Sequence, residues 1–196
     1  MEAKKIAEVL GIELQKVEMI INESTIISQL TTPEEARKLY GTCPVSMQSA
    51  VIEKWKELAI PQLTTPEEAR RLYNNCPDST RSAVIEKWKE LVKEAIPQLT
   101  TPEDARKLYS NCPESMESAV IEKWKELVEE AIPQLTTPED ARELYNNCLV
   151  SMKPVVIEKW KELAIPQLTT PEEARRLYDT CPVSMQFAVI KAMTNL

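Results

Sequence analysis

One short unit, copied five times, constrains the fold of this chain more than any other feature. The hexapeptide QLTTPE begins at Gln29, Gln62, Gln98, Gln134 and Gln167, so successive copies start 33, 36, 36 and 33 residues apart. The second and third copies differ at only seven of 36 positions. Self-similarity with this period is typical of proteins that stack one supersecondary unit many times.

Each copy carries the sequence signals of two helices joined by a short link. In TTPE the second threonine stands where an N-cap belongs, proline follows at the first helical position, and an acid comes three residues after the threonine. A first helix of about two turns is expected, ending near Tyr40 in copy one. The predicted capping boxes are Thr32 with Glu35, Thr65 with Glu68 and Thr170 with Glu173, while Asp104 and Asp140 are shorter acids opposite Thr101 and Thr137.

The second helix has an apolar stripe and a charged face. Val51, Trp55 and Ala59 share an arc of about 120° with Ile52 and Leu58, and lysines and glutamates occupy the other side. Three additional residues in copies two and three lengthen this helix by nearly one turn before IPQL ends it. The expected starts are near a serine present in every copy: Ser46, Ser79, Ser115, Ser151 and Ser184.

Because a two-turn helix is marginal alone and such a hairpin cannot close a core, stacking is required. We therefore predict an all-α fold, a right-handed α-solenoid of five two-helix repeats forming one continuous domain. Residues 1–28 are expected to form an N-terminal helical cap, with a capping hairpin between Lys4 and Ser24. The predicted repeats span residues 29–61, 62–97, 98–133, 134–166 and 167–196.

Composition argues against catalysis. The chain has no histidine, which excludes Ser-His-Asp and Cys-His nucleophilic sites and ordinary catalytic zinc sites. Its only glycines are Gly11 and Gly41, too few for a P-loop or a Rossmann fingerprint. These absences all follow from one repeated unit, so they form a single observation. We expect no catalytic residues, no cofactor and no metal.

Net charge restricts the class of partner. The formal charge of -7 disfavours nucleic acid and anionic membranes, which bind clustered Lys and Arg. No stretch approaches eighteen consecutive apolar residues, and the N-terminal segment is interrupted by acids, so a cytoplasmic protein is expected.

Cysteines and aromatic residues also repeat once per copy. Cys43, Cys76, Cys112, Cys148 and Cys181 lie in the links, too far apart in a stack for disulfides, and are interpreted as small apolar groups. The alternative is a redox or thiolate metal site. The five tyrosines and four tryptophans lie on apolar arcs, so packing between hairpins is favoured over an exposed aromatic platform.

Differences between copies concentrate in the link and the first turn of the second helix. In a solenoid these positions form one edge, where partners often bind, although drift after duplication gives the same pattern. The candidate partner-binding residues are Thr42, Gln48, Asn74, Asn75, Asp78, Arg81, Ser110, Asn111, Glu114, Glu117, Asn146, Asn147, Lys153, Asp179 and Thr180.

The register of residues 29–196 resembles the DNA-reading repeats of transcription activator-like effectors. There a leucine-led short helix beginning near Thr-Pro-Glu precedes a variable dipeptide, matched here by Asn74-Asn75 and its equivalents. The resemblance implies sequence-specific DNA reading. However, Cys-Pro or Cys-Leu replaces the Gly-Gly of those repeats, their Lys-Gln pair is missing, and copy three carries eight acids against four bases.

In helix count and repeat length the chain is similar to tetratricopeptide and HEAT arrays, without the tetratricopeptide Trp-Leu-Gly-Tyr pattern. Residues 6–24 resemble a bacterial helix-turn-helix, but Glu13, Glu18 and Glu23 would face phosphate, which favours a cap. We expect a non-catalytic scaffold that binds protein or peptide through its variable edge or concave face, with nucleic-acid reading as the alternative. Phe187, Met193 and Leu196 make self-association through the last copy a further expectation.

Overall fold

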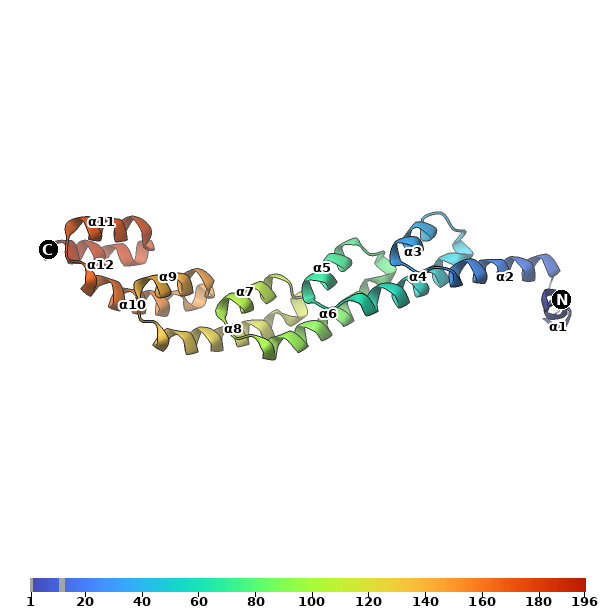
Figure 1. Ribbon diagram of the computed structural model, residues 1–196, viewed down its shortest axis with the longest axis horizontal. Coiled ribbons are helices and arrows are strands. Elements are labelled where there is room, and N and C mark those ends of the chain that lie inside the picture. The colour runs from blue at the N-terminus through green and yellow to red at the C-terminus, as the bar shows by residue number, and fades with distance from the viewer. Residues whose placement is uncertain (1, 11–12) are drawn as a thin grey trace. The chain divides into compact units, whose positions relative to one another are not determined.

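The computed structural model describes residues 2–10 and 13–196, and these residues form α-helices and short 3-10 turns with no strand (Figure 1). Consecutive helices pack in pairs, as in α3 with α4, α7 with α8, α9 with α10 and α11 with α12. The predicted all-α class is therefore confirmed. The helices are α1 Glu2–Leu10, α2 Leu14–Ser28, α3 Pro33–Tyr40, α4 Val45–Ala59, α5 Pro66–Asn75, α6 Arg81–Ala95, α7 Pro102–Ser110, α8 Glu117–Ala131, α9 Pro138–Asn147, α10 Lys153–Ala164, α11 Pro171–Thr180 and α12 Val183–Met193.

Contacts divide the chain into two compact units, Met1–Leu91 and Val92–Leu196, with the boundary inside α6. In the first unit α1 packs against α2, and α2 against α4, so the N-terminal segment is helical as predicted. The turn of the predicted capping hairpin, at residues 11–12, lies outside the described residues. The single continuous solenoid stays a prediction. Among the described helices, none combines the length and apolar character needed to cross a membrane.

The threonine-proline signals start the first helix of every copy. In α5, Thr65 Oγ1 accepts a hydrogen bond from Glu68 N at 3.2 Å, and the Glu68 carboxylate accepts from Thr65 N at 3.2 Å and Thr64 N at 2.9 Å. The boxes at Thr32 and Thr170 are also complete. Asp140 closes a full box with Thr137, whereas the Asp104 carboxylate accepts from the Thr101 hydroxyl at 2.7 Å.

The second helices begin close to the predicted serines, with one difference between copies. In copies one and five, α4 and α12 start one residue before the serine. In the other three copies the serine lies inside a 3-10 turn, such as Asp78–Thr80, and the α-helix starts two residues after it. Pro154 falls in the first turn of α10, where its missing N–H is tolerated. Each full-length second helix then ends at an Ile-Pro-Gln 3-10 turn.

The core repeats with the sequence. An alanine in each first helix and a valine in each second helix are fully buried, as Ala36 and Val51 show in copy one. Every tryptophan is buried, between 2% and 6% exposed, which confirms that these side chains pack inside the fold. The equivalents of this pair are Ala69, Ala105, Ala141 and Ala174 with Val84, Val120, Val156 and Val189.

Within the second unit, Trp124 shows how one hairpin packs on the next. Its ring shares a hydrophobic cluster with Leu144 and Val156 of copy four. Its indole N–H donates to Asn147 O at 2.8 Å, and its ring centroid lies 5.8 Å from that of Tyr109 in its own hairpin. All five tyrosines are half-buried, and in copies two and four Tyr73 and Tyr145 also pack on the tryptophans of their own copies. The tryptophan is therefore the bridge between successive hairpins.

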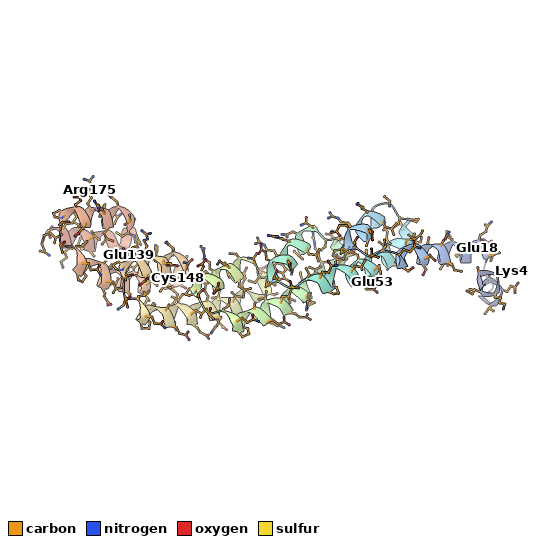
Figure 2. The ribbon with its side chains drawn as sticks, viewed as in Figure 1. Lys4, Glu18, Glu53, Glu139, Cys148 and Arg175 are labelled. Atoms are coloured by element: carbon orange, nitrogen blue, oxygen red, sulfur yellow. The ribbon has the colours of Figure 1, made fainter. Side chains whose placement is uncertain are left out.

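The opposite face of the second helices carries ion pairs between neighbouring turns. In α4, Lys56 Nζ lies 2.8 Å from Glu53 Oε1 and Lys54 Nζ lies 3.3 Å from Glu57 Oε2. Similar pairs recur in α6, α8 and α10, and Figure 2 shows Glu53 on the surface of its helix. Exposed pairs of this kind contribute less than about 1 kcal/mol each to the free energy of unfolding. This side of the second helices is therefore a solvated face.

We predict that Trp124→Ala lowers the free energy of unfolding by about 3 to 5 kcal/mol, because it empties a buried volume and removes the hydrogen bond to Asn147 O. Urea unfolding followed by circular dichroism measures this change. Trp124→Phe keeps most of the volume and is expected to cost less. A loss below about 1 kcal/mol for the alanine variant would contradict the bridging role of the indole.

The capping carboxylates make stability depend on acid pH. The hydrogen bond from Thr64 N, followed by that from the Thr64 hydroxyl, lowers the pKa of Glu68 below its ordinary value of 4.5. Because the folded pKa is depressed, this contribution is complete above pH 4.5 and is lost as the pH falls through the folded value. Comparing the unfolding of the wild type and Glu68→Gln between pH 7 and pH 3 should show a stability difference that shrinks with acidification. A difference independent of pH would contradict this prediction.

Candidate functional site

The variable edge, defined as the fifteen candidate residues named from the sequence, is a mostly exposed set of side chains. Thr42, Asn74, Asn75, Asp78, Arg81, Ser110, Glu114, Asn146, Asp179 and Thr180 are exposed. The other five, Gln48, Asn111, Glu117, Asn147 and Lys153, are half-buried. All lie at the end of the first helix or in the link and first turn that follow, so each hairpin contributes a comparable group.

The second residue of each variable dipeptide has a structural task that sequence reasoning missed. Its side chain donates to the carbonyl oxygen four residues earlier and so satisfies the end of the first helix. The signal was present, since this position is asparagine or threonine in every copy. These five bonds are Thr42 to Lys38 O at 3.3 Å, Asn75 to Arg71 O at 2.8 Å, Asn111 to Lys107 O at 2.9 Å, Asn147 to Glu143 O at 3.1 Å and Thr180 to Arg176 O at 3.0 Å.

The first turn of the second helix packs back on the tyrosine of the first helix. The Arg81 guanidinium lies 5.5 Å from the centre of the Tyr73 ring and pairs with Asp78 at 3.1 Å. At the same position in copy four, Lys153 Nζ lies 4.4 Å from the centre of the Tyr145 ring. A cation above an aromatic ring is held in place, so these edge charges are presented in a defined position.

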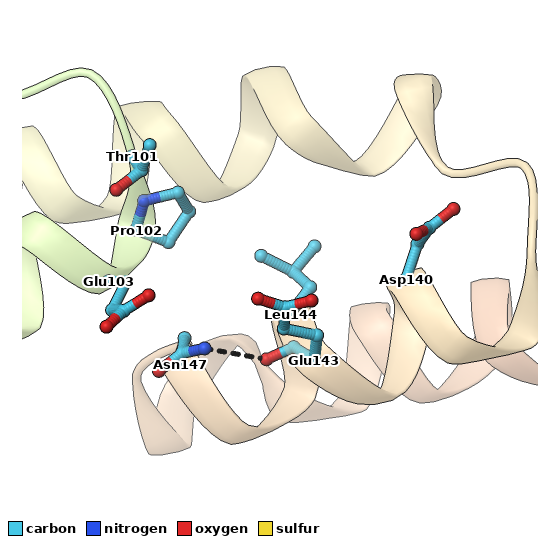
Figure 3. Close-up of a pocket in the computed structure, with 7 residues that line it drawn as sticks. All are labelled: Thr101, Pro102, Glu103, Asp140, Glu143, Leu144 and Asn147. Carbon is cyan, nitrogen blue, oxygen red and sulfur yellow. Dashed lines mark hydrogen bonds between the residues drawn. The ribbon is translucent and has the colours of Figure 1, made fainter.

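A pocket of about 230 Å³ lies between the start of α7 and the exposed side of α9, with the edge residue Asn147 in its lining (Figure 3). Three carboxylates line it, those of Glu103, Asp140 and Glu143. Glu103 is paired with Lys107 at 2.8 Å, and Asp140 caps the backbone of Thr137. The remaining carboxylate, that of Glu143, forms no ion pair with a described residue.

Glu143 marks a reversal of charge that the sequence interpretation did not single out. Its position is lysine or arginine in the other four copies, and in copies two, three and five that cation pairs with a glutamate one turn earlier. In copy four the residue one turn earlier is Glu139, so two like charges stand at spacing i, i+4. The pocket of Figure 3 is therefore locally acidic.

A second pocket in the same unit has the opposite character. It has a volume of about 470 Å³, and its lining includes Arg142 and Trp160 together with the edge residues Asn146 and Thr180. The described residues that line it include no carboxylate. Sequence reasoning placed Asn146 and Thr180 on the edge but did not bring them together with a tryptophan and an arginine.

All five cysteines are free thiols at equivalent positions. Cys76, Cys148 and Cys181 are buried, and Cys43 and Cys112 are half-buried. Each thiol lies within hydrogen-bonding range of the tyrosine carbonyl three residues earlier, as Cys112 Sγ does at 3.3 Å from Tyr109 O. Burial, with a smaller effect of the Glu117 charge, raises the pKa of Cys112 to about 11. Burial also raises the pKa of Cys148 and Cys181, so these three thiols are poor nucleophiles.

The last copy, in the second unit, has apolar side chains that are exposed to solvent. Phe187 is 78% exposed and Leu196 is 49% exposed, whereas Met193 packs against the cluster that contains Trp160. Two of the three residues expected to mediate self-association are therefore on the surface.

Among the described residues, no group of three His, Cys, Asp or Glu side chains is placed to hold a metal ion. A scan against protein-family models finds no match, and the searches of curated proteins and of solved structures find no similar protein. Function must therefore be inferred from the edge and its pockets.

We predict that Cys112 reacts slowly with iodoacetamide in the folded chain. With its pKa raised from 9.0 to about 11, its thiolate fraction at pH 8 is roughly one hundredth of that of an ordinary cysteine. Mass spectrometry of peptides from folded and guanidine-unfolded protein gives the rate at each cysteine. Equal rates for Cys112 in the two states would show that its thiol is not protected.

Proposed function

We propose that the chain is a non-catalytic scaffold, a two-helix α-solenoid of five repeats that binds protein or peptide partners through its variable edge. The observation that carries the proposal is the separation of constant and variable positions within each hairpin. The capping threonines and the buried alanines and valines are the same in all five copies, and tryptophan is present in the first four, while the exposed residues beside the link differ. A fixed frame that presents changing side chains at regular spacing suits recognition of an extended partner.

The edge offers chemically different contacts within one unit. An acidic pocket adjoins Asn147, and a pocket that contains Arg142 adjoins Asn146 and Thr180. Neighbouring sites of opposite charge favour a partner that carries both signs, as a polypeptide does. A polyanion would meet the carboxylates of Glu103 and Glu143 beside the edge, and the net charge of -7 opposes its approach.

The proposal predicts that partner binding depends on the edge of copy two. The variant Asn74→Gly, Asn75→Thr, Asp78→Val and Arg81→Gln replaces four edge residues with those of copy one, which the same fold already accommodates. The wild type and this variant are used as tagged bait, and retained proteins are quantified by mass spectrometry. We expect at least one protein to be retained by the wild type and lost with the edge variant.

A matched control exchanges exposed residues between copies away from the edge. Arg71→Lys and Lys93→Glu introduce residues that copy three carries at these positions. This control should retain the partner, and circular dichroism should show equal helix content in all three proteins. If every retained protein is indifferent to the edge exchange, the edge does not bind partners. Retardation of a DNA fragment at low salt would instead favour the nucleic-acid alternative.

A further inference from the structure

The junction between copies four and five contains a buried donor without an acceptor. Among the described residues, Trp160 Nε1 is buried and has no hydrogen-bond partner, and the side chain is 2% exposed. An unpaired N–H inside a protein loses its water without replacement, which is unfavourable. The same position one copy earlier is satisfied, since Trp124 donates to Asn147 O at 2.8 Å.

The space beside Trp160 lies where that hydrogen bond is found in the preceding junction. Asn147 corresponds to Thr180 in copy five. Trp160 and Thr180 line the same pocket of about 470 Å³, and the indole N–H makes no hydrogen bond to the link of copy five. The helix lengths explain the difference, because α8 has 15 residues and α10 has 12. Three residues correspond to about 4.5 Å of helix, so the next hairpin is displaced by nearly one turn.

The other polar groups of this pocket define what would fit. The hydroxyl of Thr180 already donates to Arg176 O, and the thiol of Cys181 lies near Tyr178 O. Arg142 forms no ion pair with a described residue and brings a positive charge to a lining without carboxylates. The lining also includes the hydroxyl of Tyr145 and the amide of Asn146. With the Trp160 indole and the Arg142 guanidinium, these groups are donors that can hydrogen-bond to an oxygen anion, and the guanidinium alone among them is charged.

We propose that the pocket between copies four and five binds a carboxylate, with the Trp160 indole N–H and the Arg142 guanidinium as its donors. The proposal deepens the function proposed above, since it names the chemistry that one pocket on the variable edge accepts. The carboxylate comes from an acidic side chain or from the C-terminus of a bound polypeptide. The two sources share this chemistry, and different probes separate them.

The test observes the four indole N–H signals of ¹⁵N-tryptophan-labelled full-length protein by NMR. Trp160→Phe identifies the Trp160 signal. N-acetylglycine represents a chain terminus, and N-acetylglutamate N-methylamide represents an acidic side chain. We expect the Trp160 signal to move downfield and saturate with at least one of these probes, while the Trp124 signal, already bonded to Asn147 O, does not move.

Two controls make the result specific. N-acetylglycinamide has no carboxylate and should leave the Trp160 signal in place. Arg142→Gln should weaken carboxylate binding about tenfold or more, whereas Arg106→Gln, the same position in copy three, should not. The proposal is wrong if the Trp160 signal does not respond to either carboxylate, responds equally to the neutral amide, or responds equally in Arg142→Gln.

Failure of this test is separable from failure of the scaffold function. The edge exchange in copy two and the NMR titration concern different copies. Suppose that a partner is lost with the edge exchange but the Trp160 signal does not respond to either carboxylate. The scaffold function would then be supported, and only the carboxylate site would be wrong.

Discussion

Packing of an indole from one hairpin against the next is the interaction on which the rest of each unit depends. A first helix of eight to ten residues is too short to be stable alone. It is held because tryptophan side chains fill the space around it: Trp124 shares a cluster with Ala105 of its own copy and with Cys148 in the link of the next. In the cluster around Trp124, the same side chain contacts Tyr109 of its own copy and donates to Asn147 O of the next. Trp124 thus both buries apolar surface and donates a hydrogen bond to a backbone carbonyl of the next hairpin.

Local features of the fold could be predicted because their causes lie within a few residues. The start of α5 is determined by three neighbouring residues, Thr65, Pro66 and Glu68, so the cap could be predicted from the sequence alone. The 3-10 turn that precedes α6 was not anticipated, because Ser79 lies in that turn and the α-helix begins only at Arg81. Such boundaries differ by single backbone hydrogen bonds, which a propensity argument does not resolve.

The location of the candidate site was predicted, but the different roles of its residues were not. Variation between copies found the edge, but the restriction of the second dipeptide position to asparagine or threonine was not used to separate it from the exposed first position. The bond of 2.8 Å from Asn75 to Arg71 O shows that this second position caps the helix. The Trp160 pocket depends on where a hairpin some twenty residues later is placed, and no local pattern encodes this distance. Glu143, in contrast, was visible in the alignment of copies as a reversed charge.

Duplication explains why so few positions are available for recognition. Copying the unit also copies its hydrogen-bond donors and acceptors, and a substitution at a capping asparagine would leave a carbonyl at a helix end unsatisfied. Side chains beside the link escape this constraint, so sequence changes accumulate there. A change in repeat length acts differently, because it alters the junction without replacing any framework residue. Removing three residues from the second helix moves the next link by about 4.5 Å, far beyond the few tenths of an ångström that a hydrogen bond tolerates. The 33-residue spacing of copy four thereby turns a satisfied junction like that of Trp124 into an open one at Trp160, and the buried Val128 of copy three is lost with the three residues.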